Sequence, residues 1–270
     1  MTLSGRSVAG AFLLLVAAAV TLAGWLAPAG YAAQDRESPS LAPCRRYPLG
    51  TDELGRDLFA RLLYGGRVSL LLAGGAAAVS TGIAAIVGLG AGFAGGAGVF
   101  LLERSSSLLL SLPWLFLLLA VRSALPLDTV PETSAWVTFL VLALLGWAAP
   151  AQVIARCAAA LARSGFALRA RTQGSGVSRI LLVQLLPNLR PVVVSQFLVL
   201  FPGFILTEAT LSFLGLGVAE PLPSWGGLLR GLEDYTAVAA SPWKLAPLLA
   251  LVLVAAAIQA ATGKKETHPV

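Results

Sequence analysis

Charged residues are scarce in this 270-residue chain: they make up 12% of it, whereas 57% of the residues are hydrophobic and the mean hydropathy is +0.82. Soluble globular domains carry about 25% charged residues. So few charges leave too little polar surface for a water-soluble fold, and disorder is excluded because it requires low hydrophobicity. The continuous apolar runs also argue against an outer-membrane barrel, whose strands alternate apolar and polar residues. The composition therefore predicts an all-α, polytopic integral membrane protein.

Residue types that build catalytic and metal sites are also nearly absent. The chain has one histidine, His268, and two cysteines, Cys44 and Cys157, which we expect to be structural. A single histidine does not make a histidine-based catalytic or zinc site. The phosphate-binding pattern G-x-x-x-x-G-K-[ST] is missing, so ATP is not bound by that means. We expect no enzymatic activity, no metal and no cofactor bound by this chain.

Six apolar stretches are candidates to cross the hydrocarbon core, which takes about 20 residues of helix. We interpret the first as an uncleaved anchor; the alternative is a cleaved signal peptide. No predicted span holds two facing carboxylates, which argues against a carrier driven by buried acid relays. The stretches are Ser7–Ala33, Val68–Leu102, Ser105–Val121, Thr133–Ala155, Pro191–Thr207 and Leu245–Gly263.

The distribution of arginines sets the predicted orientation. Six arginines and no acidic residue lie between Arg156 and Arg190, whereas almost all acidic residues lie in segments on the opposite side. Cytoplasmic loops carry an excess of Lys and Arg. We therefore expect the arginine-only loop and both termini to be cytoplasmic.

Two segments next to the predicted spans have recognisable local patterns. In the segment from Tyr47 to Leu70, a turn is followed by leucines on one face and charges on the other, which predicts an amphipathic helix lying in the membrane interface. In the segment from Phe166 to Asn188, a short basic helix should meet a glycine-rich turn, and a second helix from about Ser178 should stop at Pro187. Such an elbow could dock into a soluble partner or be an ordinary connector.

The segment from Thr207 to Gly226 combines glycines and prolines near the membrane. Irregular backbone at that depth is tolerated only against protein or a water-filled cavity, so we expect this segment to form the wall of a translocation path. Glu208 is the one carboxylate with apolar segments on both sides. It is either a gate residue or a carboxylate that caps a broken helix.

Together these segments resemble the peptide/nickel class of ABC-importer permeases, specifically the dipeptide- and oligopeptide-permease subunit with an extra N-terminal span. The resemblance covers roughly residues 45 to 260. It rests on five motifs in order: PLGTD-x-x-GRD from Pro48, YG-x-R-x-SL from Tyr64, Leu-Pro-Asn from Leu186, E-A-x-LSFLGLG from Glu208 and PSWG from Pro223.

The resemblance implies a domain organisation and a set of partners. Residues 1–45 would hold the N-terminal anchor and the start of an external segment, residues 46–263 a permease domain with a coupling loop at about 164–188, and residues 264–270 a short cytoplasmic tail. The chain would be half of a channel in the inner (cytoplasmic) membrane. Its partners would be a homologous second permease, two ATPase subunits that use ATP and magnesium, an extracytoplasmic solute-binding protein and the lipid bilayer, but no nucleic acid.

Candidate site residues fall into three groups. The ATPase-coupling loop would use Arg169, Ala170, Arg171, Gly174, Arg179 and Pro187. The translocation path or gate would use Glu208, Ser212, Phe213, Gly215, Gly217 and Trp225. The external interfacial helix would use Gly50, Thr51, Asp52, Gly55, Arg56 and Asp57.

The chain departs from the pattern of that class at three places. Leu168 stands where the coupling loop usually has glutamate, Tyr47 stands where histidine is common, and a short GKKETHPV tail replaces an acidic, arginine-bearing one. The expected substrate is a small solute, most often a peptide or a metal chelate such as nickel. The rival functions are a stand-alone carrier or channel without an ATPase, a membrane enzyme or assembly factor, and an exporter of the same family.

Overall fold

The computed structural model describes residues 5–124, 130–233, 238–239 and 241–262. Within these ranges the chain is built from helices, with two isolated β-bridges and no strand. It divides into two compact units. Unit 1 is Met1–Gly74, Leu125–Phe139 and Pro202–Val270; unit 2 is Gly75–Ala124 and Leu140–Phe201.

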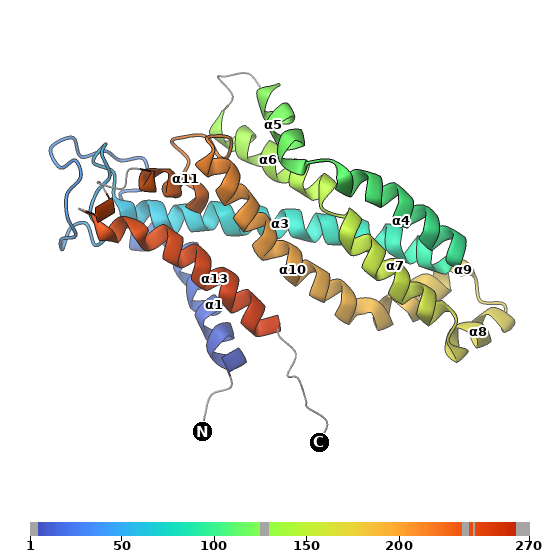
Figure 1. The fold of residues 1–270 in the computed structure, drawn as a ribbon. Coiled ribbons are helices and arrows are strands. Elements are labelled where there is room, and N and C mark those ends of the chain that lie inside the picture. Colours follow the sequence, from blue (N-terminus) through green and yellow to red (C-terminus); the bar gives the residue numbers. More distant parts are fainter. Residues whose placement is uncertain (1–4, 125–129, 234–237, 240, 263–270) are drawn as a thin grey trace. The chain divides into compact units, whose positions relative to one another are not determined.

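Four helices of the described chain are long and apolar enough to span a membrane, which confirms the predicted all-α polytopic class (Figure 1). A fifth apolar helix, Ser7–Thr21, is shorter. An α-helix rises 1.5 Å per residue, so the 36-residue α3 is about 54 Å long and exceeds the hydrocarbon thickness of roughly 30 Å. The four are Leu58–Phe93, Pro131–Ala162, Val177–Phe213 and Pro242–Ala261.

Unit 1 is centred on the packing of its first and last helices. Helix α1 packs along α13, and α13 also contacts the short helix α11. A small apolar cluster joins Ala23 and Ala27 to Ala60 and Leu63 at the start of α3. The elements of unit 1 are α1 (Gly5–Thr21), α2 (Ala23–Leu26), the first part of α3 (Leu58–Phe93), the first part of α6 (Pro131–Leu145), the last part of α10 (Leu186–Phe213), α11 (Trp225–Leu229), the 3-10 turns η2 (Arg230–Leu232) and η3 (Pro242–Leu245), and α13 (Ala246–Thr262).

Unit 2 holds the remaining parts of α3, α6 and α10 together with further helical segments. Those described are α4 (Gly96–Ser111), α5 (Trp114–Ser123), α7 (Ala148–Ala162), α8 (Gly165–Thr172), α9 (Val177–Arg179) and the π-helix η1 (Ile180–Leu185). Helix α7 is alanine-rich and packs closely against α4.

Several predicted span boundaries were wrong because local backbone breaks override hydropathy. Gly95, with φ +84°, ends the second span at Phe93 and starts α4. The third span is divided into α4 and α5 just before Pro113, since the residue preceding a proline is disfavoured in a helix. The first span stops at Leu26, just before Pro28, rather than reaching Ala33.

Two glycines of α3, Gly88 and Gly92, lie directly against α7 within unit 2. A Cβ atom at Gly88 would lie 2.8 Å from the carbonyl oxygen of Ala151, and one at Gly92 would lie 2.6 Å from that of Ala155. Both partners are on α7. Glycine at these positions lets the two helix backbones approach closely, as small residues do in membranes.

Candidate functional site

A buried carboxylate lies near the end of α10. Glu208 is fully buried, and its Oε1 accepts hydrogen bonds from the hydroxyls of Ser212, at 2.5 Å, and Ser224, at 2.7 Å. Ser69 of α3 lies at 3.5 Å from its Oε2. Helix α10 runs on for five residues beyond Glu208, so the carboxylate lies within α10 and not at its end. Glu208 instead links α10 and α3 to the segment that precedes α11.

That segment folds back onto α3 through Ser224 and Trp225. The Ser224 hydroxyl caps α11 by accepting a bond from the Gly227 N–H. The backbone N–H of Trp225 donates to Ser69 Oγ at 3.1 Å, and its indole N–H donates to the carbonyl of Leu62 at 2.9 Å. A Cβ at Gly66 would lie within 3.0 Å of the Trp225 ring, so α3 has no side chain where the indole packs.

The break after α10 follows the pattern expected from its glycines. The helix ends at Phe213, and the Leu216 N–H bonds the Leu211 carbonyl while the Gly215 N–H bonds the Ser212 carbonyl, which is a Schellman cap. Gly215 supplies the required positive φ of +79°. The predicted irregular backbone at this point is confirmed.

Burial divides the six predicted path residues into two groups. Glu208, Ser212 and Trp225 are at most 2% exposed, and Gly217 is buried against Ser212. Phe213 and Gly215 are exposed in the structure. Glu208, Ser212 and Trp225, together with their hydrogen-bond partners Ser69 and Ser224, form what we call the Glu208 cluster. This cluster anchors the segment that precedes α11.

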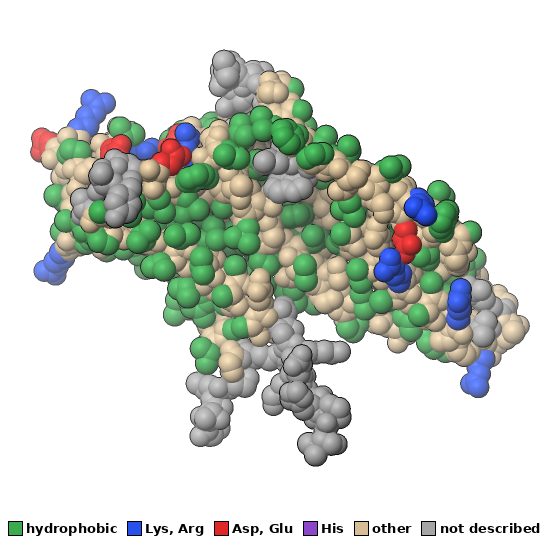
Figure 2. Space-filling model, viewed as in Figure 1, with side chains coloured by type: hydrophobic (Ala, Val, Ile, Leu, Met, Phe, Trp, Pro, Cys, Tyr) green, Lys and Arg blue, Asp and Glu red, His purple; other side chains and the backbone are tan. Residues whose placement is uncertain are grey.

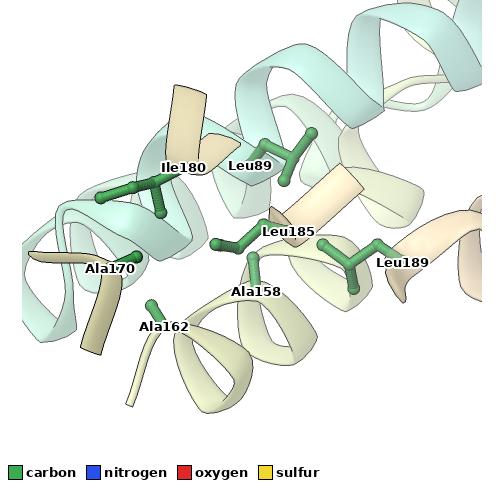
Figure 3. Packing of buried hydrophobic residues seen from close by; sticks show 7 residues of the cluster. All are labelled: Leu89, Ala158, Ala162, Ala170, Ile180, Leu185 and Leu189. Carbon is green, nitrogen blue, oxygen red and sulfur yellow. The ribbon is translucent and has the colours of Figure 1, made fainter. Parts of the chain in front are cut away.

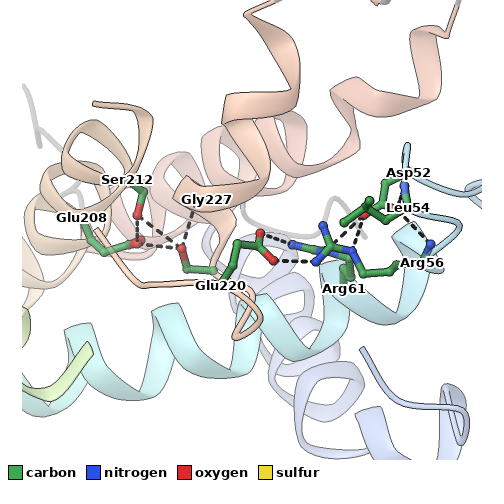
Figure 4. Close-up of polar contacts among 9 residues, drawn as sticks. Asp52, Leu54, Arg56, Arg61, Glu208, Ser212, Glu220 and Gly227 are labelled. Carbon is green, nitrogen blue, oxygen red and sulfur yellow. Dashed lines mark hydrogen bonds and ion pairs between the residues drawn. The ribbon is translucent and has the colours of Figure 1, made fainter. Parts of the chain in front are cut away.

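A second polar group, the ion-pair cluster, consists of Asp52, Arg56, Arg61 and Glu220 (Figure 4). Glu220 accepts from Arg56 Nη1 and Arg61 Nη2, both at 2.6 Å. Asp52 accepts from Arg56 Nε at 2.7 Å and from Arg61 Nη1 at 3.3 Å. These bonds tie the loop after α10 to the start of α3, within unit 1.

The predicted interfacial helix is wrong: residues 50–57 form a loop, and α3 begins only at Leu58. Gly50 and Gly55 have φ of +70° and +73°, and both pack against backbone carbonyls, of Leu41 and Asp35 respectively. Thr51 is fully buried and donates its hydroxyl to the Ser38 carbonyl at 2.6 Å. The amphipathic pattern was misleading because turn geometry, not a buried face, determines these residues.

A cavity of about 550 Å³ lies beside the ion-pair cluster. Its charged lining residues are the acids Asp52, Glu53, Glu220 and Glu233 and the bases Arg56, Arg61, Arg230 and Lys244. The two signs are balanced, so the cavity favours neither a simple anion nor a simple cation. Among the described residues, no three His, Cys, Asp or Glu side chains gather as metal ligands.

The predicted elbow, residues 166–188 of unit 2, packs on a buried apolar cluster. Ala170 of α8 packs with Ile180 and Leu185 of η1, together with residues of α3, α7 and α10 (Figure 3). Gly174 turns the chain with φ +74°, and Arg169 and Arg179 are exposed. Arg171 belongs to α8, but its side chain lies outside the part of the chain that is described.

The predicted helix stop at Pro187 is wrong. Pro187 is the second residue of α10, and the helical path from Val177 to Phe213 is continuous. The preceding turn is a π-helix, in which the Leu186 N–H donates to the Leu181 carbonyl. Pro187, which has no N–H to donate, therefore lies where the π-helical hydrogen bonds give way to α-helical ones. The Asn188 side chain donates to the backbone carbonyl of Gln184, one turn earlier in the π-helix, at 2.6 Å.

Sequence reasoning missed Ser69, Ser224 and the pair Arg61–Glu220 as site residues. Ser69 and Ser224 were inside recognised motifs but had no chemical reason to be singled out. Arg61 and Glu220 are 159 positions apart, so only the folded chain brings them together.

The ion-pair cluster makes stability depend on acidic pH. Partial burial by itself would raise the pKa of Glu220, but hydrogen bonds and positive charge from Arg61 and Arg56 outweigh it, so the pKa lies below its ordinary value of 4.5. A lowered carboxylate pKa stabilises the fold above the unfolded-state value, and that contribution is lost as pH falls through the folded-state value. We expect Glu220→Gln to remove up to about 1 kcal/mol near neutral pH, since Glu220 is half exposed.

The measurement is the thermal midpoint of the purified chain between pH 7 and pH 4. The wild-type advantage over Glu220→Gln should shrink as the pH falls below about 4.5. A constant difference across that range would show that the carboxylate charge does not contribute.

Known proteins match most of this chain. Residues 84–263 match the family model described as binding-protein-dependent transport system inner membrane component. A Brucella suis protein, provisionally named a peptide permease, is 35% identical over 218 residues, covering 80% of this chain and 70% of its own length. The di/tripeptide permease DppC of Pseudomonas aeruginosa is 32% identical, covering 83% and 74%. The oligopeptide permease OppC of Haemophilus influenzae is 32% identical, covering 84% and 71%.

The long apolar helices define a polytopic helical membrane protein. The chain belongs to the family of inner-membrane components of binding-protein-dependent transport systems. It is a non-catalytic permease subunit of an ATP-driven importer, as the sequence motifs predicted, and this supports the permease over the stand-alone carrier.

Proposed function

We propose that this subunit imports peptides as half of a channel, with a homologous second permease, two ATPase subunits and an extracytoplasmic solute-binding protein. The names of DppC and OppC support a peptide substrate. Charges of both signs around the cavity of unit 1 are also suited to a peptide, whose termini carry opposite charges. A metal chelate is the less supported substrate.

We propose an orientation in the cytoplasmic membrane with both termini and the elbow inside. Arginines without acids in the segment from Arg156 to Arg190 support it through the positive-inside rule. The loop before α3 would then be external, and α3 would cross from it to the cytoplasmic side. Lys264 and Lys265 of the expected cytoplasmic tail lie outside the described residues.

The observation that carries the proposal is the construction of the elbow. Its exposed arginines stand on buried Ala167 and Ala170, and the cluster beneath them contains residues from the ends of membrane helices, Leu89 of α3 and Leu189 of α10. A movement of α8 would therefore be transmitted to the ends of these helices through packed side chains. Coupling requires differential contacts in two states, and such an elbow can provide them to an ATPase.

In the path, we propose that the exposed turn at Phe213 and Gly215 contacts the solute, while the Glu208 cluster holds that turn in place. Burial of Glu208 supports an anchoring role rather than direct contact with the solute.

Charge reversal of the elbow tests the coupling role. We expect Arg169→Glu with Arg171→Glu to lower the substrate-stimulated ATPase activity of the assembled importer at least about fivefold. A fivefold change corresponds to the smallest of the typical coupling free energies, about 1 kcal/mol. The matched control is Arg36→Glu with Arg45→Glu, two exposed arginines of the loop before α3. Unchanged stimulation with normal assembly would remove the elbow from the mechanism.

A further inference from the structure

A groove of about 380 Å³ lies between α4 and α7 in unit 2, and none of its lining residues was assigned to coupling or to the path. Its small residues, Gly96, Ala159 and Ala160, leave room between the two helices, and charged side chains surround them. Figure 2 shows Lys and Arg side chains gathered over the region of α4, α7 and α8, next to an apolar surface.

The charges of the groove are predominantly positive and accessible. Arg156 donates Nε to Glu103 at 2.7 Å, and its side chain is 67% exposed. Arg163 also lines the groove, is exposed, and has no ion pair with any described residue. Arg104 lies 5.1 Å over the ring of Phe100, one turn back on α4. Within the lining the two arginines outnumber the single glutamate, and Arg104 adds a positive charge beside the lining residue Phe100.

The apolar neighbours of these arginines continue along one helix. Phe100 and Leu108 precede and follow Arg104 by four residues, so the three share a face of α4, and Phe100 and Leu108 are 59% and 73% exposed. Exposed apolar side chains next to these cations match the neighbourhood of phosphate and acyl chain at a membrane interface.

We propose that this groove binds the phosphate of an anionic phospholipid, with an acyl chain along the exposed face of α4. Arg163 and Arg104 would contact the phosphate, to which guanidinium groups bind through paired hydrogen bonds. Glu103 would hold Arg156 in place at the side of the groove. The proposal rests on the transmembrane family of the chain and not on its substrate or its ATPase coupling.

The test uses the full-length chain in detergent, titrated with phosphatidylglycerol and followed by native mass spectrometry. An arginine near a membrane surface contributes about 1 kcal/mol to anionic-lipid binding, which corresponds to about fivefold in affinity. We expect Arg104→Gln with Arg163→Gln to weaken phosphatidylglycerol binding at least about tenfold. The control, Arg36→Gln with Arg45→Gln, removes the same charge from the loop of unit 1 and should bind as the wild type does.

Three results would overturn the proposal. The first is equal phosphatidylglycerol binding by the groove variant and its control. The second is displacement of the lipid by millimolar inorganic phosphate, which would make this a site for free anions. The third is that the groove variant binds the lipid as the wild type does but no longer purifies with the second permease or the ATPases. That result would make the groove a protein-docking surface. None of these results would alter the proposed function, because elbow coupling is read out separately.

Discussion

Replacing Glu208 by alanine should lower the thermal midpoint of the purified chain by about 5–15 °C. The substitution removes the acceptor of two short hydrogen bonds, from Ser212 and Ser224, and leaves a cavity with stranded hydroxyls around it. Breaking a buried polar network of this kind costs about 2–4 kcal/mol, and 1 kcal/mol shifts the midpoint of a chain of this size by roughly 2–4 °C. Transport should fall with it, because the turn at Phe213 and Gly215 loses its anchor.

Two comparisons make the Glu208 experiment specific. Glu208→Gln keeps an acceptor oxygen at the same place and should cost less than Glu208→Ala. Glu37→Ala removes an exposed glutamate and should leave both the midpoint and transport unchanged. If Glu208→Ala melts at the same temperature as Glu37→Ala, the buried carboxylate does not anchor the segment.

Valine at Gly92 should destabilise the chain by about 2–3 kcal/mol. A Cβ there would lie 2.5 Å from the Cβ of Ala158 and 2.6 Å from the Ala155 carbonyl oxygen, so α3 and α7 would have to separate. Overpacking of a close interface typically costs 1–3 kcal/mol, and the neighbour here is partly backbone, which does not move aside as a flexible side chain does.

Gly82→Val is the matched control on the same helix. Nothing lies within 4 Å of a Cβ built at Gly82, so valine at this position should leave the midpoint unchanged or slightly raised. Thermal unfolding of both variants in detergent measures the difference. Equal midpoints would mean that the α3–α7 contact does not depend on glycine.

The fold class could be predicted from sequence because hydropathy depends on composition over about 20 residues. Boundaries depend on single residues, and there the prediction was less accurate. Pro187 indicated a helix end, but a π-helical turn accommodates it, and Gly95 ended a span that hydropathy extended to Leu102. The pattern of the chain gives no warning of either, because both depend on the local hydrogen bonds of the folded backbone.

The motifs located the candidate site, but their residue types did not reveal its geometry. Glu208 was singled out correctly as unusual, yet its partners Ser69 and Ser224 come from other elements. The loop at residues 50–57 was predicted as a helix because Leu54 lies at helical spacing from Leu58 and Leu62, with charged residues on the other face. Two glycines with positive φ and the buried hydroxyl of Thr51 determine a loop instead.

The sidedness of the elbow tests the central claim most directly. Cys44 is exposed in the loop before α3, and Gln173 is exposed in the elbow, so one native and one introduced cysteine can report the two sides. The reporters would be Cys157→Ser, which keeps Cys44, and Cys44→Ser with Cys157→Ser and Gln173→Cys. In intact cells a membrane-impermeant thiol reagent should label Cys44 but not the cysteine at 173, and inverted vesicles should reverse this. Labelling of position 173 in intact cells would contradict the account.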